Sequence, residues 1–151
     1  MEIQHISKEA TTISEDASFH DAVSLMIKKQ TNSLLVIDTN GVLVGEVSVT
    51  DLLDAIVPEY LDGDSIAAHF ASTSMFTEAV TGTAEQHVKF FMDTEVKPVR
   101  EDEGIMAIAA AAIANKRARI PVVDADGKPV GIISRRGLKH IIADALKIDR
   151  Q

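Results

Sequence analysis

The side chains best suited to chemistry in this sequence lie in two similar phrases, at residues 45–52 and 131–138. The first reads GEVSVTDL and the second reads GIISRRGL. Both begin with Gly, carry Ser at the fourth place and end with Leu, but Asp51 of the first phrase is replaced by Gly137 in the second. A carboxylate can accept strong hydrogen bonds from hydroxyl groups of a ligand. The sequence therefore raises the question of why one copy lacks the acid.

Positive charge gathers shortly before and within the second phrase, although the whole chain has a net charge of −8. The basic residues concerned are Lys116, Arg117, Arg119, Arg135 and Arg136. A protein that binds nucleic acid through many phosphates usually carries a larger basic face. This cluster suits one small phosphorylated ligand instead, so we expect no nucleic-acid partner. The alternative is that these side chains are solvated surface.

The sequence gives little support for an enzyme. Its five histidines lie in separate segments without a His-x-x-x-His pair, and the chain has no Cys. A zinc centre or a catalytic histidine is therefore not expected. Gly-x-x-x-x-Gly-Lys and Gly-x-Gly-x-x-Gly loops are absent, and Ser48 has no neighbouring base in sequence that would activate it.

The composition is typical of a globular chain with an aliphatic core. Hydrophobic residues make up 46% of the 151 residues and aromatic residues only 4%. This length allows one domain or two very small ones. We find no basic-then-apolar leader and no apolar run of about 18 residues, the length of a membrane span. We therefore expect a soluble, cytoplasmic protein without membrane association.

The two phrases belong to a longer internal repeat. At an offset of 86 positions, residues 6–56 face residues 92–142 without a gap. Such a register indicates two copies of one structural unit. Identical pairs include Val36/Val122, Gly41/Gly127, Gly45/Gly131, Ser48/Ser134 and Leu52/Leu138.

Each copy predicts the element order β-α-β-β-α. The Asn-Gly and Asp-Gly steps at 40–41 and 126–127 suit the tight turn of a hairpin. The helix expected at 105–116 is rich in small residues, so we expect it to be buried. The predicted segments are extended starts at 11–13 and 97–99, helices at 19–30 and 105–116, first strands at 33–37 and 119–123, return strands at 42–47 and 129–133, and second helices after Ser48 and Ser134.

We therefore expect a mixed α/β (α+β) fold in which repeats at 1–56 and 88–151 pack about a pseudo-twofold axis. Each repeat alone is too small to bury its apolar faces. A partly helical connector occupies 57–87, with short helices expected at 65–70 and 75–80. Its apolar residues are expected to pack on the body or on a partner chain, and a movable lid is the alternative.

These phrases resemble a tandem pair of CBS domains, the cystathionine-beta-synthase type regulatory module also called a Bateman module. The resemblance rests on VGEVSVTDLL, VGIISRRGLK and RIPVVDADGKPVG. The family signature is Gly, two apolar residues, Ser or Thr, two residues, then Asp. The first copy meets it except that Glu46 replaces an apolar residue, and the second copy meets it up to Gly137.

The resemblance implies a non-catalytic regulatory module that binds an adenosyl ligand (AMP, ADP, ATP or S-adenosylmethionine) in a cleft between the repeats. It implies no obligatory cofactor and no metal. Two such modules commonly join, so we expect a homodimer that signals to an effector protein of unknown identity. The alternative is a degenerate pair that serves only dimerisation or protein interaction, without nucleotide.

The resemblance places the ribose acceptor at Asp51 and the family's hydroxyl at Ser48, and Thr50 is added as a neighbour. An ordinary helix-start carboxylate is the alternative for Asp51. In the regulatory gamma subunit of AMP-activated kinase, which this sequence resembles in these motifs, two basic positions that face the phosphates correspond to Arg119 and Arg136. Adenine is expected among Thr12, Ile13, Val47, Ile120 and Pro121.

The acid missing at Gly137 implies that the two copies are not equivalent in binding. The second copy lacks the ribose acceptor, and Arg135 would crowd that position further. We therefore expect one competent site and one degenerate or empty site. The alternative is that Gly137 makes room for a different ligand.

Overall fold

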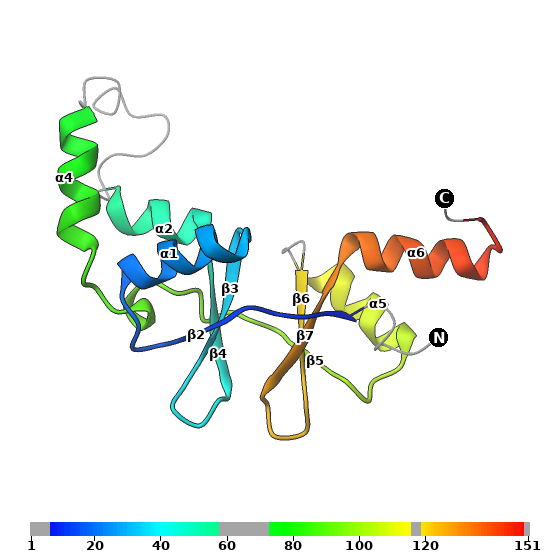
Figure 1. Ribbon diagram of the computed structural model, residues 1–151. Helices are drawn as coiled ribbons and strands as arrows, with labels where there is room; N and C mark the ends of the chain where they lie inside the picture. Colours follow the sequence, from blue (N-terminus) through cyan, green and yellow to red (C-terminus); the bar gives the residue numbers. More distant parts are fainter. Residues whose placement is uncertain (1–6, 58–72, 116–118, 150–151) are drawn as a thin grey trace. The chain divides into compact units, whose positions relative to one another are not determined.

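The computed structural model describes residues 7–57, 73–115 and 119–149. The chain divides into two compact units, each described by itself below (Figure 1). The repeat-1 unit holds the described parts of Thr11–Asp38 and Val44–Thr94. The repeat-2 unit holds those of Met1–Ala10, Thr39–Leu43 and Glu95–Gln151. The earliest described residues and the tip of the first hairpin thus group with the second repeat.

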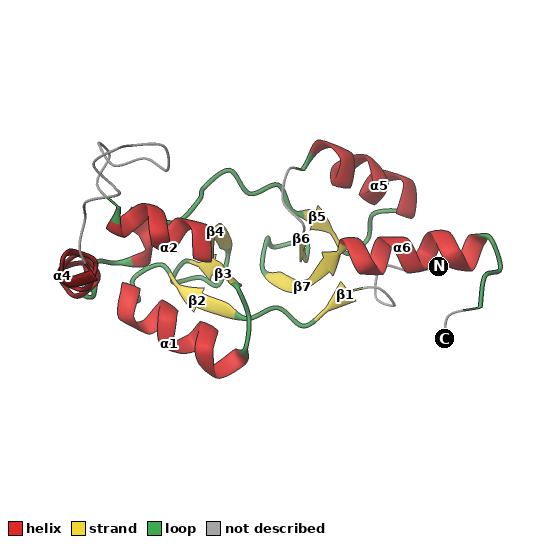
Figure 2. Ribbon diagram, turned by 90° about the horizontal axis from the view of Figure 1, so that it is seen from above, coloured by secondary structure: helices red, strands yellow, loops and turns green. Residues whose placement is uncertain are grey.

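The repeat-1 unit is a small sheet covered by helices (Figure 2). Its strands run in the order β2-β3-β4, and β2 is parallel to β3. Its elements are β2 (Thr12–Ser14), α1 (Phe19–Lys29), β3 (Ser33–Ile37), β4 (Leu43–Ser48), α2 (Val49–Ile56), α4 (Thr73–Thr83) and the 3-10 turn η2 (Val88–Phe90).

The core of this unit lies between the sheet and helices α1 and α2. Alternate residues Leu34 and Val36 of β3 are fully buried there, as strand geometry requires of one sheet face. Met26 of α1 and the α2 residues Leu52 and Ile56 complete the same cluster. The predicted amphipathic helix and strand patterns therefore meet in one aliphatic core.

Local signals define α1 closely. Ser18 accepts a hydrogen bond from the Asp21 N–H, and Asp21 accepts one from the Ser18 N–H, which forms a capping box. The helix ends at Lys29, because Gln30 takes a left-handed conformation with φ 53°. The prediction of a helix to residue 30 was thus one residue too long.

The repeat-2 unit follows the same plan with one added strand. Its sheet has the order β1-β7-β6-β5. Buried Ile108 of α5 packs with Ile120 and Val122 of β6 and with Ile133 of β7. The elements are β1 (Ser7–Lys8), β5 (Val99–Arg100), α5 (Ile105–Ala114), β6 (Arg119–Val123), β7 (Pro129–Ser134) and α6 (Arg135–Ala145).

The structure reproduces the offset of 86 found in the sequence. In the parallel pair of repeat 1, Ile13 faces Val36, and in that of repeat 2, Val99 faces Val122. Adding 86 to 13 and to 36 gives 99 and 122. The predicted first strands at 33–37 and 119–123 agree with β3 and β6.

The expectation that the helix at 105–116 is buried was wrong. Only Ile108 of α5 is buried, whereas Met106 and Ile113 are 83% and 87% exposed. One helix face suffices to cover the small sheet, and no described segment of the chain covers the other. The helix also ends earlier than predicted, at Ala114.

The connector packs against the repeat-1 unit. Ala79 and Val80 of α4 are packed against its core. Met75 and Phe76 of the same helix are about half exposed, at 50% and 53%. The structure therefore supports packing on the body for part of the connector, while the helix expected at 65–70 lies outside the described residues.

Each return strand is paired at its edge by a segment from outside its own repeat. Strand β1, at Ser7–Lys8, runs antiparallel to β7. At the edge of β4, Glu46 and Asp93 exchange backbone hydrogen bonds of 2.9 and 2.8 Å. The sequence analysis missed both pairings, because a contact of two residues carries no periodic pattern.

The repeated glycines of the motif permit these pairings. A Cβ atom added at Gly45 would lie 2.7 Å from Met92 Sδ and 2.9 Å from Asp93 O. One added at Gly131 would collide with Ser7 Oγ and lie 2.9 Å from Lys8 O. Neither backbone could come so close to a larger residue. The glycine that opens each phrase therefore has a packing role in both repeats.

We predict that Gly131→Ala destabilises the chain by about 1–3 kcal/mol, because the added methyl group must push β1 away from β7. Chemical denaturation followed by circular dichroism measures the change.

Gly82→Ala is the matched control, since no atom lies within 4 Å of a Cβ built at this helical position. It should be neutral or stabilise by up to about 1 kcal/mol. A Gly131→Ala variant as stable as the wild type would contradict the close approach of β1.

Candidate functional site

Three of the residues singled out by the sequence, Ser48, Thr50 and Asp51, lie where β4 ends and α2 begins. Ser48 is the last residue of β4 and the N-cap of α2, with extended backbone. Thr50 is exposed on the first turn, and Asp51 follows it, half-buried. The first phrase is therefore a strand-to-helix junction with two hydroxyls and a carboxylate.

Ser48 and Asp51 hold each other in a capping box. The Ser48 N–H donates to Asp51 Oδ2 at 2.8 Å, and the Ser48 hydroxyl donates to the same oxygen at 3.0 Å. In return, the Asp51 N–H donates to Ser48 Oγ at 3.4 Å. In the described part of the chain, Asp51 Oδ1 takes part in no hydrogen bond. The carboxylate thus serves the helix with one oxygen and leaves the other open.

The capping box of α1 shows that this device can be purely structural. Ser18 and Asp21 also exchange the two reciprocal bonds of a capping box: the Ser18 N–H donates to Asp21 Oδ2 at 3.1 Å, and the Asp21 N–H donates to Ser18 Oγ at 3.0 Å. No ligand role is predicted for either residue. A capping aspartate alone therefore does not establish a binding site. Asp51 does act as a helix-start carboxylate, which was the alternative to a ligand role.

The second junction keeps the hydroxyl and loses the acid. Ser134 ends β7 and caps α6, and its Oγ accepts from the Gly137 N–H at 3.2 Å. Because Gly137 has no carboxylate, the hydrogen bond from the N-cap backbone N–H to a side chain three residues later, which Ser48 makes to Asp51, has no counterpart here. This helix start needs only the serine, so the dropped acid leaves its fold intact and removes an acceptor from its surface.

The predicted arginines gather at this second junction. Arg119 opens β6 and lies opposite Ser134 in the β6–β7 register. Arg136, exposed, lies on the first turn of α6. The structure thus brings the two arginines to one edge of the repeat-2 unit. Asp51 belongs to the repeat-1 unit, so the prediction that the arginines share a ligand with it stays a prediction.

Most of the residues expected around adenine lie in the two cores. Ile13 and Val47 belong to the core of the repeat-1 unit, and Ile120 to that of the repeat-2 unit. Pro121 is fully buried, whereas Thr12 is exposed. The structure gives the apolar members a packing role, and their contact with adenine stays a prediction.

Glu46 lies within β4, two residues before Ser48. Its backbone pairs with Asp93 and its side chain is 5% exposed, which is unusual for a carboxylate. The residue that departs from the family signature is therefore a buried acid in the strand that leads to the Asp51 helix.

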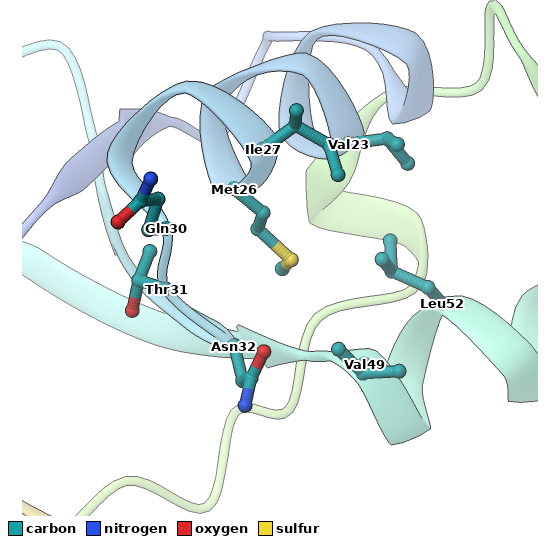
Figure 3. A pocket seen from close by; sticks show the side chains of 8 residues that line it. All are labelled: Val23, Met26, Ile27, Gln30, Thr31, Asn32, Val49 and Leu52. Atoms are coloured by element: carbon teal, nitrogen blue, oxygen red, sulfur yellow. The ribbon is translucent and has the colours of Figure 1, made fainter.

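Each unit also has an apolar groove between its two helices. In the repeat-1 unit, the groove measures about 420 Å³ and runs between α1 and α2, with Met26, Ile27, Val49 and Leu52 facing it (Figure 3). Polar residues Gln30 and Asn32 lie at its end.

In the repeat-2 unit, the groove measures about 660 Å³ and lies between α5 and α6. Ile105, Ile113, Leu138 and Ile142 are among its lining residues. Neither groove contains Asp51, Arg119 or Arg136, so the grooves are surfaces separate from the predicted ligand site.

The repeated junctions and sheets agree with a comparison to known families. The sequence profile of the CBS domain matches residues 2–58 and 87–144. The chain therefore belongs to the CBS-domain family and carries two copies of the domain, as the sequence analysis predicted.

Related proteins share nearly the whole of this chain. CBS domain-containing protein CBSX2, chloroplastic, of Arabidopsis thaliana is 32% identical over 153 residues, and CBSX1 of the same plant is 32% identical over 152 residues. These matches cover 97% of this chain but only 60% and 61% of the plant proteins. Uncharacterized protein MJ1426 of Methanocaldococcus jannaschii is 28% identical, over 91% of this chain and 89% of that protein.

Solved structures confirm the mixed α/β fold of a CBS pair. The crystal structure of CBSX2 from Arabidopsis thaliana has a TM-score of 0.74 at 24% identity and covers 98% of both chains. A CBS domain-containing protein of Kribbella flavida has a TM-score of 0.78 at 18% identity, covering 95% of this chain and 99% of that one. CBSX2 in complex with AMP has a TM-score of 0.66 at 26% identity, covering 95% and 97%.

The described residues contain neither a membrane-spanning helix nor a cluster of metal ligands. No helix among them is long and apolar enough to cross a bilayer. Within 7–57, 73–115 and 119–149, no three His, Asp or Glu side chains gather in a way that could hold a metal ion.

The pKa of Asp21 provides a test of the capping box of α1. The hydrogen bond from the Ser18 backbone, then that from its hydroxyl, lowers the pKa of the Asp21 carboxyl below its ordinary value of 3.8. Because the folded pKa is the lower one, ionised Asp21 stabilises the fold above pH 3.8, and this contribution is lost as the pH falls through the folded pKa. Ser18→Ala should raise the pKa of Asp21 towards 3.8, as measured by NMR titration.

His20→Gln provides the control, since the charge of His20 is the weakest of the causes that lower this pKa. It should change the Asp21 titration less than Ser18→Ala does. An Asp21 pKa that is unaffected by Ser18→Ala would contradict the contribution of the Ser18 hydroxyl, since alanine keeps the backbone N–H.

Proposed function

We propose that this chain is a non-catalytic regulatory module that binds one adenosyl ligand at the β4–α2 junction. The ligand belongs to the AMP, ADP, ATP or S-adenosylmethionine class, with Asp51 accepting the hydroxyl groups of its ribose. The carrying observation is the open Oδ1 of the half-buried Asp51 on the first turn of α2. CBSX2, which was crystallised with AMP, supports the ligand class.

The phosphate end of the ligand is assigned to the cations of the second junction. Arg119 and Arg136 lie at the end of the β6–β7 strand pair where α6 begins, and a helix N-terminus favours phosphate through its backbone N–H groups. Thr50 on α2 supplies an exposed hydroxyl. In this proposal, the ribose binds to Asp51 of the first repeat and the phosphates bind to the two arginines of the second, so that one ligand contacts both repeats.

We predict that Asp51→Ala weakens AMP binding by about 10- to 100-fold, the loss expected for hydrogen bonds to a charged group worth about 1.5–3 kcal/mol. Isothermal titration of AMP, ATP and S-adenosylmethionine against the wild type and the variant measures it.

Asp54→Ala is the matched control, because Asp54 is an exposed carboxylate on the same helix α2. It removes the same charge and should leave the dissociation constant within about twofold of the wild type. Equal binding by Asp51→Ala and the wild type would reject the assignment of Asp51.

An interaction module that binds no nucleotide is the second candidate. It is favoured by the structural use of Asp51 in the capping box and by the buried acid at Glu46. In that case none of the three ligands would bind the wild type in the titration.

We further propose that two copies of the chain associate through the helix pairs of both repeats. The grooves expose apolar side chains, with Ile27 75%, Ile113 87% and Ile142 62% exposed. Because both repeats present the same kind of helix pair, a second copy offers matching apolar faces to both. Burial of these faces would supply the covering that α5 lacks within the single chain.

We predict a dimer in light scattering coupled to size-exclusion chromatography, and a monomer for Ile113→Glu, because a charge would be buried in the interface. Val130→Glu is the control: Val130 is 46% exposed on β7 of the same unit and lies outside the groove. A wild type that runs as a monomer at all concentrations would overturn this assignment.

Signalling needs a partner protein, which we propose responds to a ligand-dependent change in the dimer. A ligand shifts the equilibrium between two conformations of the dimer only by its difference in affinity for them.

A cytoplasmic location remains our prediction for this chain, although the two plant relatives are named chloroplastic.

A further inference from the structure

The hydroxyl of Ser48 is already committed within the chain. A serine hydroxyl has one proton to donate, and Ser48 donates it to Asp51 Oδ2 at 3.0 Å. Its oxygen faces the Asp51 N–H at 3.4 Å. Phosphate oxygens of a bound nucleotide can only accept hydrogen bonds from the protein. In this arrangement, Ser48 therefore has no proton to offer them.

The carboxylate of Asp51 divides into an occupied and an open half. An ionised carboxylate offers about four acceptor positions, two on each oxygen. The N–H and the hydroxyl of Ser48 take both positions of Oδ2. The two positions of Oδ1 equal the number of O–H groups on the ribose diol.

We propose that Ser48 is a positioning residue for Asp51, which holds the carboxylate so that Oδ1 receives both ribose hydroxyls. This inference rests on the proposed function, because it assumes that an adenosyl ligand binds at Asp51. A hydroxyl beside a helix N-terminus could otherwise donate to a phosphate, but the proton of Ser48 is already donated to Asp51. Ser48 then contributes to binding through the sugar, by removing the freedom of the Asp51 side chain before the ligand arrives.

Two other described helix starts that a serine caps supply the comparison within this chain. Ser18 and Asp21 form the same box on α1, where no ligand is assigned. Ser134 caps α6 opposite Gly137, where no carboxylate is available to position. Only at α2 does the serine hold an acid that has a proposed ligand.

The arrangement also fixes how an amide would sit in place of the acid. In Asp51→Asn, the side-chain oxygen must face the two donors of Ser48, because an NH₂ group there would meet two further donors. The NH₂ group then faces the ribose, where two acceptor positions are needed. Asp51→Asn should therefore keep the helix cap and lose ribose binding about as fully as Asp51→Ala.

The test compares adenosine with AMP by isothermal titration against full-length variants. Ser48→Ala should weaken both ligands by the same factor, about 5- to 30-fold, since the lost contact acts on the sugar that both share. Ser48→Thr keeps the hydroxyl and should restore binding of both. In an Asp51→Ala background, Ser48→Ala should cause no further loss, because two residues that act through one contact are not additive.

Two variants guard against a merely structural effect. Ser18→Ala removes the equivalent cap on α1 and should leave both dissociation constants unchanged. Ser48→Gly removes the hydroxyl but is a favourable N-cap, so it tests the proposal even if Ser48→Ala folds poorly. It should show the same equal loss for both ligands.

The outcomes separate the two levels of the proposal. A Ser48→Ala or Ser48→Gly variant that weakens AMP and leaves adenosine unchanged would show direct contact with phosphate and overturn the positioning role. Additive losses with Asp51→Ala would overturn it as well, while leaving the nucleotide site in place. A wild type that binds neither adenosine nor AMP would reject the proposed function, and the positioning role with it.

Discussion

Both sheets of this protein depend on a close backbone contact at the glycine that opens each repeated phrase. At Gly131 the contact is made by Ser7 and Lys8, and at Gly45 by Met92 and Asp93. Each contact pairs the outer edge of a return strand with residues from outside that repeat. These strands lead directly into α2 and α6, so the contacts also fix the strand ends from which the candidate site residues project.

The serine that ends each return strand caps a helix in both repeats, but only in the first does it also bind an acid. Ser48 and Ser134 both cap a helix, and both accept the N–H of the residue three places on. Only Ser48 has an acid to hold in return. The absence of a carboxylate at Gly137 therefore has a partly structural explanation. The helix start of the second repeat folds with the serine cap alone, so the repeat keeps its architecture although it lacks this polar acceptor.

Much of the fold could be predicted because its signals are local or periodic. The offset of 86, the alternation in β3 and β6, and the glycine turns gave the element order and strand bounds. Pairing of Ser7–Lys8 with β7 could not be predicted, since two residues leave no pattern and their partner lies over a hundred positions away. The exposure of Met106 and Ile113 was misjudged because apolar composition does not say which face of a helix finds a partner.

The site was predictable in its residues and less so in their bonding. The family resemblance singled out Ser48, Asp51 and the arginines, and the structure places each at a strand-to-helix junction or strand start. Sequence alone did not show that Asp51 Oδ2 is already used by its own helix, because a capping acid and a ligand-binding acid occupy the same position in the motif. The same Ser-x-x-Asp spacing occurs at Ser18 and Asp21, where it marks a helix start without a predicted ligand.

The exchange of edge segments has a consequence for how such modules can be moved between proteins. A repeat cut from this chain at its own boundaries would leave the segment that pairs its outer strand behind. Its return strand would then present open N–H and C=O groups, an invitation to non-native pairing with other chains. For this sequence, the smallest portable piece is thus the pair with its leading residues, and a lone repeat is an incomplete part.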